Sequence, residues 1–365
     1  MGTIFITTIT VTTFTGLLAL LLTLADRTIG NYGELQITIN DDKEYIVEGG
    51  DSLLSSLISQ QIFIPSACGG KGTCGYCKVK ILEGGGPVLS TELPWLTGEE
   101  IEDNVRISCQ CKVKEDMRIE IPEELFNVRE YQVTIETIED LTPRIKRLRL
   151  RFKDGEEIDF KPGQYVQLKA PIYEGNDEEV YRAYSIASPP SDKSYIDLII
   201  GYVGGKATTY VHKFLSEGDT VDINGPYGDF QYQDTYDNDM VMVAVGTGFA
   251  PILSILYYMR DNDIRRKARF YFGARTPEDL FLLDEIEALE EELYDFQFIP
   301  TLSRVLDEHD WTGERGRVNV ALDKHIKSPE DKEAYLCGSP GMIDTVIEVL
   351  KDKGILEESI YYDKF

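Results

Sequence analysis

The stretch SACGGKGTCGYC, residues 66–77, decides the fold of this chain. It holds three of the six cysteines, Cys68, Cys74 and Cys77, with five residues between the first two and two between the last two. Four glycines lie among these thiols, so the backbone can wrap closely around a ligand. A further thiol, Cys109, follows after a long gap. Three close thiolates and one distant thiolate are the ligand pattern of a [2Fe–2S] cluster, which we predict here.

A structural zinc site is the main alternative. Zinc modules usually present two paired knuckles of cysteine or histidine, whereas this chain has one close Cys-x-x-Cys pair and three histidines far away in sequence. Bunched cysteines also differ from the spread framework of a disulfide-bonded secreted protein. Cys111 lies two residues beyond Cys109 and would share its face on a strand. We interpret Cys111 as a packing residue, with an exchange of roles with Cys109 as the alternative.

The composition sets limits on domain number and partners. A length of 365 residues predicts two or three domains, and 42% hydrophobic with 28% charged residues is ordinary for a globular protein. The net charge of −27 argues against nucleic-acid binding, because such a field repels phosphate and a basic stripe is missing. A solvated acidic surface is the simplest interpretation of this charge.

The first 25 residues contain no charged side chain. About twenty apolar residues suffice to cross a bilayer as a helix, although many threonines weaken the hydropathy here. A cleaved signal peptide needs a positively charged start, and the first basic residue is Arg27. We therefore predict a retained transmembrane anchor over residues 1–30, crossing the cytoplasmic membrane once.

Three further units are expected after this anchor. Residues 33–126 read as short strands with one short helix around the cysteine loop. Residues 128–235 read as a series of short strands, which predicts an antiparallel β-barrel. Residues 238–365 alternate strand and helix, which predicts an α/β domain with a parallel sheet.

Two motifs in the barrel unit point to a flavin nucleotide. In RAYS (182–185), the Arg182 fork suits phosphate oxygens, and Tyr184 offers a flat face on the same side of the strand. In GGKATT (204–209), free amides at a helix start and the Thr208 hydroxyl form a pyrophosphate site. RAYS alone is a weak signal, and the second motif adds weight. The predicted flavin-binding residues are Arg182, Ala183, Tyr184, Ser185, Gly205, Lys206, Ala207 and Thr208.

Two motifs in the last unit point to a dinucleotide. GTGFAP (246–251) follows an apolar strand and opens a helix, so its glycines let the backbone approach a pyrophosphate and Pro251 suits the first turn. The third glycine of G-x-G-x-x-G is absent, and an ordinary strand–helix turn is the alternative. CGSP (337–340) ends another strand, where ligands bind in open parallel sheets. A small buried packing residue is the alternative for Cys337.

The order of these motifs resembles the ferredoxin–NAD(P) reductase family with a plant-like ferredoxin domain fused ahead of it. More closely, the chain resembles the flavin- and cluster-carrying branch of the sodium-translocating NADH:quinone reductase family. Shared features are a membrane helix, the cysteine spacing and an aromatic last residue. This resemblance implies a β-grasp [2Fe–2S] domain, a β-barrel FAD domain and an NAD(P)-binding domain. The segments that carry it are RAYS, GKAT (205–208), GTGFAP, YFGAR (271–275), CGSP, PVLSTEL (87–93) and MRIEIPEELF (117–126).

The resemblance also implies roles for single residues. Tyr184 would cover one flavin face and Ser185 would lie near flavin N5. Phe365 would stand on the nicotinamide side and move aside for hydride transfer, with Cys337 nearby. These four are the predicted catalytic residues. The pair Ser303-Arg304 would lie near the adenosine ribose. Arg304 would favour a 2′-phosphate, which NADPH carries and NADH lacks, so NADPH is an alternative to NADH. The remaining predicted nucleotide contacts are Gly246, Thr247, Gly248, Pro251, Arg275, Ser303, Arg304 and Gly338.

The implied activity is electron transfer from NADH through FAD and the [2Fe–2S] cluster to membrane subunits that reduce quinone. Because NAD(P)H and cluster assembly are cytosolic, the soluble domains would lie on the cytoplasmic side. The reductase component of a multicomponent oxygenase, or another tethered NAD(P)H:acceptor reductase, is the alternative, although those reductases usually have four residues between the first two cysteines. A redox-sensing or structural protein that binds flavin without turnover is a third class.

Overall fold

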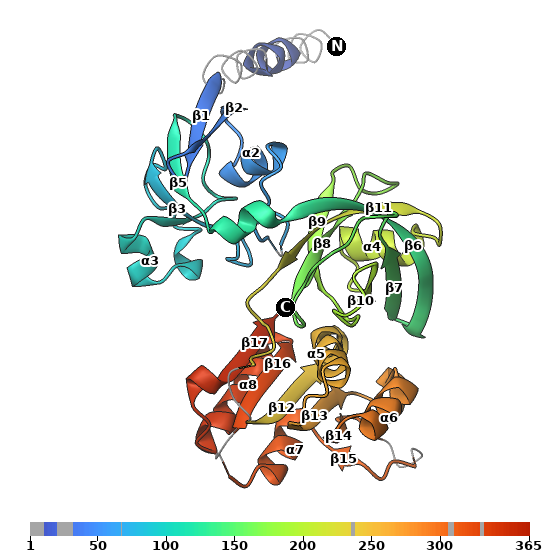
Figure 1. The fold of residues 1–365 in the computed structure, drawn as a ribbon. Helices are drawn as coiled ribbons and strands as arrows, with labels where there is room; N and C mark the ends of the chain where they lie inside the picture. Colours follow the sequence, from blue (N-terminus) through green and yellow to red (C-terminus); the bar gives the residue numbers. More distant parts are fainter. Residues whose placement is uncertain (1–10, 20–31, 67, 235–237, 306–309, 329–331) are drawn as a thin grey trace. The chain divides into compact units, whose positions relative to one another are not determined.

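The computed structural model describes residues 11–19, 32–66, 68–234, 238–305, 310–328 and 332–365. The chain forms two compact units, Met1–Asn127 and Val128–Phe365, and each is described by itself (Figure 1). The anchor predicted over residues 1–30 lies mostly outside the described residues; residues 11–19 of it are helical and exposed. Within the described ranges, no helix is both long and apolar enough to cross a membrane.

The first unit is a five-stranded mixed sheet packed against one helix. A β1–β2 hairpin lies at one side, β1 pairs in parallel with β5, and β3 joins β5 to β4. Helix α2 begins after Ser52, whose side chain accepts a hydrogen bond from the Ser55 amide, and its apolar face closes the core. This arrangement is a β-grasp domain. Its elements are β1 (Glu34–Ile39), β2 (Lys43–Glu48), α2 (Leu53–Ser59), β3 (Lys78–Glu83), η1 (Leu93–Trp95), α3 (Gly98–Glu102), β4 (Val105–Ile107), β5 (Met117–Glu120) and η2 (Glu123–Asn127).

The second unit begins with a six-stranded antiparallel sheet in the order β10-β7-β6-β11-β8-β9. Its two edge strands meet, because Ile186 just beyond β9 bridges to Leu198 of β10. The sheet therefore curves into a barrel around an apolar core, as the spacing of short strands predicted. Its elements are β6 (Arg129–Thr142), β7 (Ile145–Arg151), β8 (Tyr165–Ala170), β9 (Val180–Ser185), β10 (Tyr195–Gly201), α4 (Lys206–Lys213) and β11 (Thr220–Tyr227).

The rest of this unit is a parallel sheet in the order β15-β14-β13-β12-β16-β17. Alternate residues of β12 enter two separate hydrophobic cores. Met240 and Met242 pack with residues of α5 and α6. Val241 and Val243 pack with residues of α7 and α8 on the other face of the sheet. Its elements are β12 (Asp239–Val245), η3 (Gly246–Gly248), α5 (Phe249–Asp261), β13 (Lys267–Ala274), η4 (Pro277–Asp279), α6 (Leu283–Glu292), β14 (Asp295–Leu302), β15 (Glu314–Arg315), α7 (Val318–His325), β16 (Lys332–Gly338), α8 (Pro340–Asp352), η5 (Glu357–Ser359) and β17 (Ile360–Lys364).

The strand order of this sheet creates one switch point. The chain runs outward from β12 to β15 and then returns to β16 on the other side of β12. In open α/β sheets, ligands bind at the carboxyl ends of the strands at such a point. The carboxyl ends of β12 and β16 carry GTG and CGSP, so the fold brings these two motifs together.

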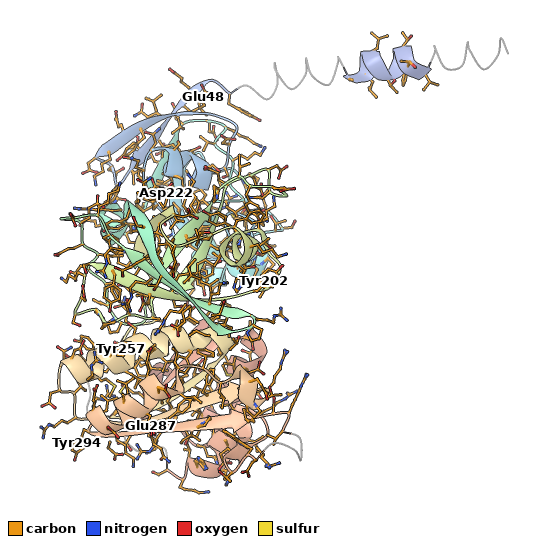
Figure 2. All side chains as sticks on the ribbon, turned by 90° about the vertical axis from the view of Figure 1, so that its right-hand side faces the viewer. Glu48, Tyr202, Asp222, Tyr257, Glu287 and Tyr294 are labelled. Atoms are coloured by element: carbon orange, nitrogen blue, oxygen red, sulfur yellow. The ribbon has the colours of Figure 1, made fainter. Side chains whose placement is uncertain are left out.

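Several contacts join the barrel to the parallel sheet. Arg147 of β7 forms an ion pair with Glu285 of α6 at 2.5 Å, and Tyr257 of α5, labelled in Figure 2, donates to the same carboxylate at 2.6 Å. A Cβ atom on Gly201, at the end of β10, would lie 3.2 Å from Thr247 Cγ2. The end of the barrel strand β10 therefore adjoins the GTG turn.

Candidate functional site

The four predicted cluster cysteines lie as two pairs. The Cys68 and Cys74 thiols are hydrogen-bonded neighbours, and so are those of Cys77 and Cys109. The hydrogen bond from Cys74 lowers the pKa of Cys68 to about 4, and that from Cys77 lowers the pKa of Cys109 to about 7. Within the described part of the chain, no three His, Cys, Asp or Glu side chains form a site for a single metal ion. Two pairs of thiols match a cluster of two irons with two thiolates on each.

The cysteine loop has the backbone that its glycines suggest. All four loop glycines, Gly69, Gly70, Gly72 and Gly75, have φ between 63° and 82°, a region that glycine enters without strain. The Gln110 side chain lies across this loop and donates from Nε2 to Cys109 Sγ at 3.7 Å. Such a donor to a sulfur ligand tunes a cluster. No pattern in the sequence pointed to this role of Gln110.

The expected strand through Cys109 and Cys111 is absent. Strand β4 ends at Ile107, and both Gln110 and Cys111 donate their amides back to the Ile107 carbonyl, at 2.8 and 3.2 Å. This turn separates the two thiols, so the expectation that they share a face was wrong. Cys111 is 2% exposed in the domain core and donates from Sγ to the Gly85 carbonyl at 3.6 Å.

Arg182 and Tyr184 lie on the same side of β9. Burial raises the pKa of the Tyr184 hydroxyl, and the nearby Arg182 guanidinium opposes this rise. The Tyr184 oxygen is buried without a hydrogen-bond partner among the described residues, although its ring is only half-buried. Arg182 donates to the Tyr181 carbonyl at 2.7 Å and forms no ion pair with a described residue. An unpaired guanidinium beside a half-open aromatic ring fits a flavin nucleotide.

The start of helix α4 supplies free backbone donors. Gly205 is the N-cap, and the first intrahelical bond runs from the Thr209 amide to the Gly205 carbonyl at 2.8 Å, so the amides of residues 206–208 precede it. The Thr208 hydroxyl holds this turn together, accepting from Val203 N at 3.4 Å and donating to the Gly205 carbonyl at 3.2 Å.

The Lys206 ammonium is directed elsewhere. It forms ion pairs with Asp177 at 3.3 Å and Glu178 at 2.9 Å, two residues of the short loop before β9. Lys206 was predicted to contact the flavin phosphates. Its backbone amide lies at the helix start, whereas its ammonium group is paired with the two carboxylates.

The two dinucleotide motifs meet at the ends of β12 and β16. A Cβ atom on Gly248 would lie 2.2 Å from the Cys337 carbonyl oxygen, and one on Gly338 would lie 2.7 Å from Val245 Cγ2. These two glycines therefore allow the strand ends to pack together. Gly246 differs, because its φ is +55° and no atom lies within 4 Å of the Cβ position. Of the glycines in these motifs, Gly246 has the open position that a ligand can approach.

Cys337 and Phe365 both lie at the carboxyl end of β16. Cys337 is fully buried, and burial raises the pKa of its thiol well above the usual range, so it stays protonated. The Phe365 amide donates to the Gly338 carbonyl at 3.1 Å, while the residue as a whole is 53% exposed. The last residue thus has a fixed backbone and a free ring beside CGSP.

Arg275, Ser303 and Arg304 lie at the neighbouring ends of β13 and β14. The Arg304 amide donates to the Arg275 carbonyl at 2.8 Å, and Ser303 Oγ donates to the Ala274 carbonyl at 3.2 Å. All three side chains are exposed. The carboxyl ends of β13 and β14 therefore present two exposed arginines, Arg275 and Arg304.

Comparison with known families agrees with this arrangement. Models of three families match in order along the chain: the 2Fe-2S iron-sulfur cluster binding domain over residues 37–114, the oxidoreductase FAD-binding domain over 132–232 and the oxidoreductase NAD-binding domain over 242–348. A solved cytochrome P450 reductase of Amycolatopsis, GcoB, is 26% identical and covers 91% of this chain and 98% of its own, with a TM-score of 0.73. A ferredoxin reductase in carbazole 1,9a-dioxygenase, 23% identical with a TM-score of 0.71 and the same coverage, shares the fold.

These domains define an NAD(P)H-dependent flavin and iron–sulfur oxidoreductase that carries electrons from NADH through FAD to a [2Fe–2S] cluster. Among curated relatives, the F subunit of the Na(+)-translocating NADH-quinone reductase of Neisseria gonorrhoeae is 36% identical, covering 95% of this chain and 96% of its own. That of Idiomarina loihiensis is 37% identical, covering 91% and 92%. The chain belongs to the family of F subunits of the Na(+)-translocating NADH-quinone reductase.

Proposed function

We propose that the chain is the electron-input component of a membrane-bound quinone reductase. Its relatives are named as subunits of such an enzyme, and the same three domains follow one another in this chain. Nicotinamide gives two electrons together as hydride, an iron–sulfur cluster takes one at a time, and flavin exchanges electrons in both ways, which explains their order. The electrons would then pass to membrane subunits that reduce quinone, and any coupling to sodium transport would reside in those partners.

The residues of the first unit and the barrel would hold the first two cofactors. Cys68 and Cys74 would bind one iron, and Cys77 and Cys109 the other, because the thiols lie as these pairs. The Arg182 guanidinium and the free amides of residues 206–208 would bind the flavin phosphates. The half-open Tyr184 ring would cover one face of the flavin, with Ser185 following on the same strand.

The parallel sheet would place the nicotinamide against the flavin. Gly246 lies in open space at the switch point and would contact the pyrophosphate. The buried Cys337 would pack beside the nicotinamide as a small uncharged side chain and would not act as a nucleophile. Arg275, Ser303 and Arg304 would lie along the adenosine ribose. A guanidinium there would also bind the 2′-phosphate of NADPH.

The uncharged first 25 residues would anchor the chain in the cytoplasmic membrane, with the soluble domains on the cytoplasmic side. The test is purification from membranes in a mild detergent without oxygen, followed by addition of NADH. We expect yellow protein with bound iron, an electron paramagnetic resonance (EPR) signal of a reduced [2Fe–2S] cluster, and co-purifying membrane subunits. Zinc in place of iron, or absence of flavin, would contradict the proposal. A soluble oxygenase as the co-purifying partner would favour the oxygenase-reductase alternative.

Replacement of the last residue tests its position at the nicotinamide side. Because the Phe365 ring is free and must leave before nicotinamide stacks, Phe365→Ala removes a stacking contact that competes with the substrate. An aromatic pair contributes about 1 kcal/mol, so NADH should bind about fivefold tighter. We also expect NADPH to become a better substrate. Titration of binding and rates of flavin reduction with both nucleotides measure these changes.

Tyr362→Ala is the matched control. Tyr362 is an exposed aromatic residue of β17, 47% exposed, and lies three residues before Phe365. This variant should leave both binding constants unchanged. Equal kinetics of Phe365→Ala and the parent protein would exclude the proposed role of Phe365.

A further inference from the structure

The segment between β3 and α3, which are labelled in Figure 1, contacts the cysteine loop through Trp95. We call residues 84–96 the covering segment. A Cβ atom on Gly75 would lie 2.9 Å from Trp95 Cε3 and 3.0 Å from Trp95 Cβ, so the indole sits directly on the backbone of Gly75. Gly75 lies between Cys74 and Cys77 and is buried. Trp95 therefore covers the turn that joins the two thiol pairs.

A buried carboxylate holds the covering segment in place. Glu92 is fully buried, and its two oxygens accept hydrogen bonds from the Leu89 amide at 2.7 Å and the Ile107 amide at 3.0 Å. The Trp95 amide donates to the Glu92 carbonyl at 2.9 Å. The backbone next to the indole is thus tied to a residue that the domain core encloses.

Arg106 completes this arrangement. Its guanidinium is 3% exposed and binds the Glu92 carboxylate through Nε at 2.9 Å and Nη2 at 2.7 Å. Nη1 donates to the carbonyls of Gly85 and Gly86, at 2.5 and 2.9 Å. The Arg106 guanidinium therefore binds both the start and the middle of the covering segment. Arg106 itself lies three residues before Cys109 in the sequence.

A buried ion pair with so many hydrogen bonds is costly to form and contributes little net stability. Its position suggests a more specific use, since groups behind metal ligands control their orientation and their access to water. The Glu92–Arg106 pair links the strand that leads to Cys109 with the tryptophan on the Cys74–Cys77 turn.

We propose that Glu92 and Arg106 are positioning residues that hold Trp95 over the cluster turn, and that this indole excludes water from the iron–sulfur site. The inference rests on the proposed ligand set. A cluster held by four thiolates carries net negative charge, and reduction makes that charge larger. Because water stabilises the more highly charged form, loss of the cover should raise the reduction potential and speed the loss of iron.

The test uses full-length protein with its cluster, prepared without oxygen. Two quantities are measured: the midpoint potential, by redox titration followed by EPR, and the rate at which an iron chelator removes the visible absorbance of the cluster. We expect Trp95→Ala to shift the potential upward and to speed cluster loss about tenfold. Trp95→Phe should restore both values in part. Trp311→Ala, at the second of the two tryptophans, is the matched control and should change neither.

Glu92→Gln separates positioning from general stability. If Glu92 acts through the indole, this change should shift the potential in the parent protein and have little further effect in Trp95→Ala. Equal effects in both backgrounds would overturn the positioning role of Glu92. A Trp95→Ala protein with the potential and loss rate of the parent would overturn the inference, whatever happens to Glu92→Gln. A parent protein without a [2Fe–2S] signal would overturn the proposed ligand set, and this inference with it.

Discussion

Cys74→Ser should leave hydride transfer from NADH to the flavin intact and abolish every later one-electron step. The hydroxyl cannot replace the thiolate beside Cys68, so one iron would lose a ligand. The FAD-binding and NAD-binding domains lie in the other unit, Val128–Phe365, and the substitution leaves their residues unchanged. Rapid mixing with NADH should therefore bleach the flavin at the parent rate, while the EPR signal of the cluster and quinone reduction by membranes disappear.

Cys111→Ser is the control for this experiment. Its thiol donates to the Gly85 carbonyl and belongs to neither cysteine pair, so the serine variant should keep the EPR signal. Cluster loss in Cys111→Ser together with cluster retention in Cys109→Ser would reverse the ligand assignment. Equal loss of flavin bleaching and of quinone reduction in Cys74→Ser would contradict the serial order of the cofactors.

Gly248→Ala should disable the predicted nucleotide site at the ends of β12 and β16. The new methyl group would lie 2.2 Å from the Cys337 carbonyl oxygen, and that atom belongs to the backbone of a central strand. The ends of β12 and β16 would have to separate by more than roughly 1 Å to reach a normal contact distance. A displacement of this size at a positioning element costs about 100-fold in rate, and overpacking costs about 1 to 3 kcal/mol of stability.

The rate of flavin reduction by NADH and the free energy of unfolding in denaturant measure these two effects. Gly341→Ala is the matched control, because Gly341 lies in the first turn of α8 with no atom within 4 Å of its Cβ position. That change should leave flavin reduction unchanged and stabilise the protein by up to about 1 kcal/mol. Parent-like flavin reduction in Gly248→Ala would show that the two strand ends can separate freely.

Much of this molecule was predictable from local patterns. The spacing of Cys68, Cys74 and Cys77, with Cys109 far along the chain, indicates a [2Fe–2S] cluster, because ferredoxin-type clusters are held by four thiolates. Runs of short strands followed by strand–helix alternation predict a barrel before a parallel sheet, since both periodicities are visible in the sequence. The family comparison agrees with this order of domains.

Other features depend on contacts between distant residues. The turn after Ile107 sends Cys111 into the core, although strand periodicity would place it beside Cys109. Gly248 stays a predicted nucleotide contact, and no pattern in the sequence indicated that it also makes room for the Cys337 carbonyl.

Glu92 and Arg106 read as ordinary charged residues in the sequence, and only folding buries Glu92, in the covering segment, against Arg106 of β4. Short-range patterns are written along the chain, because they reflect the geometry of a single strand, turn or helix. The neighbour that a side chain meets across the core depends on how separate elements pack, and no local pattern contains that information.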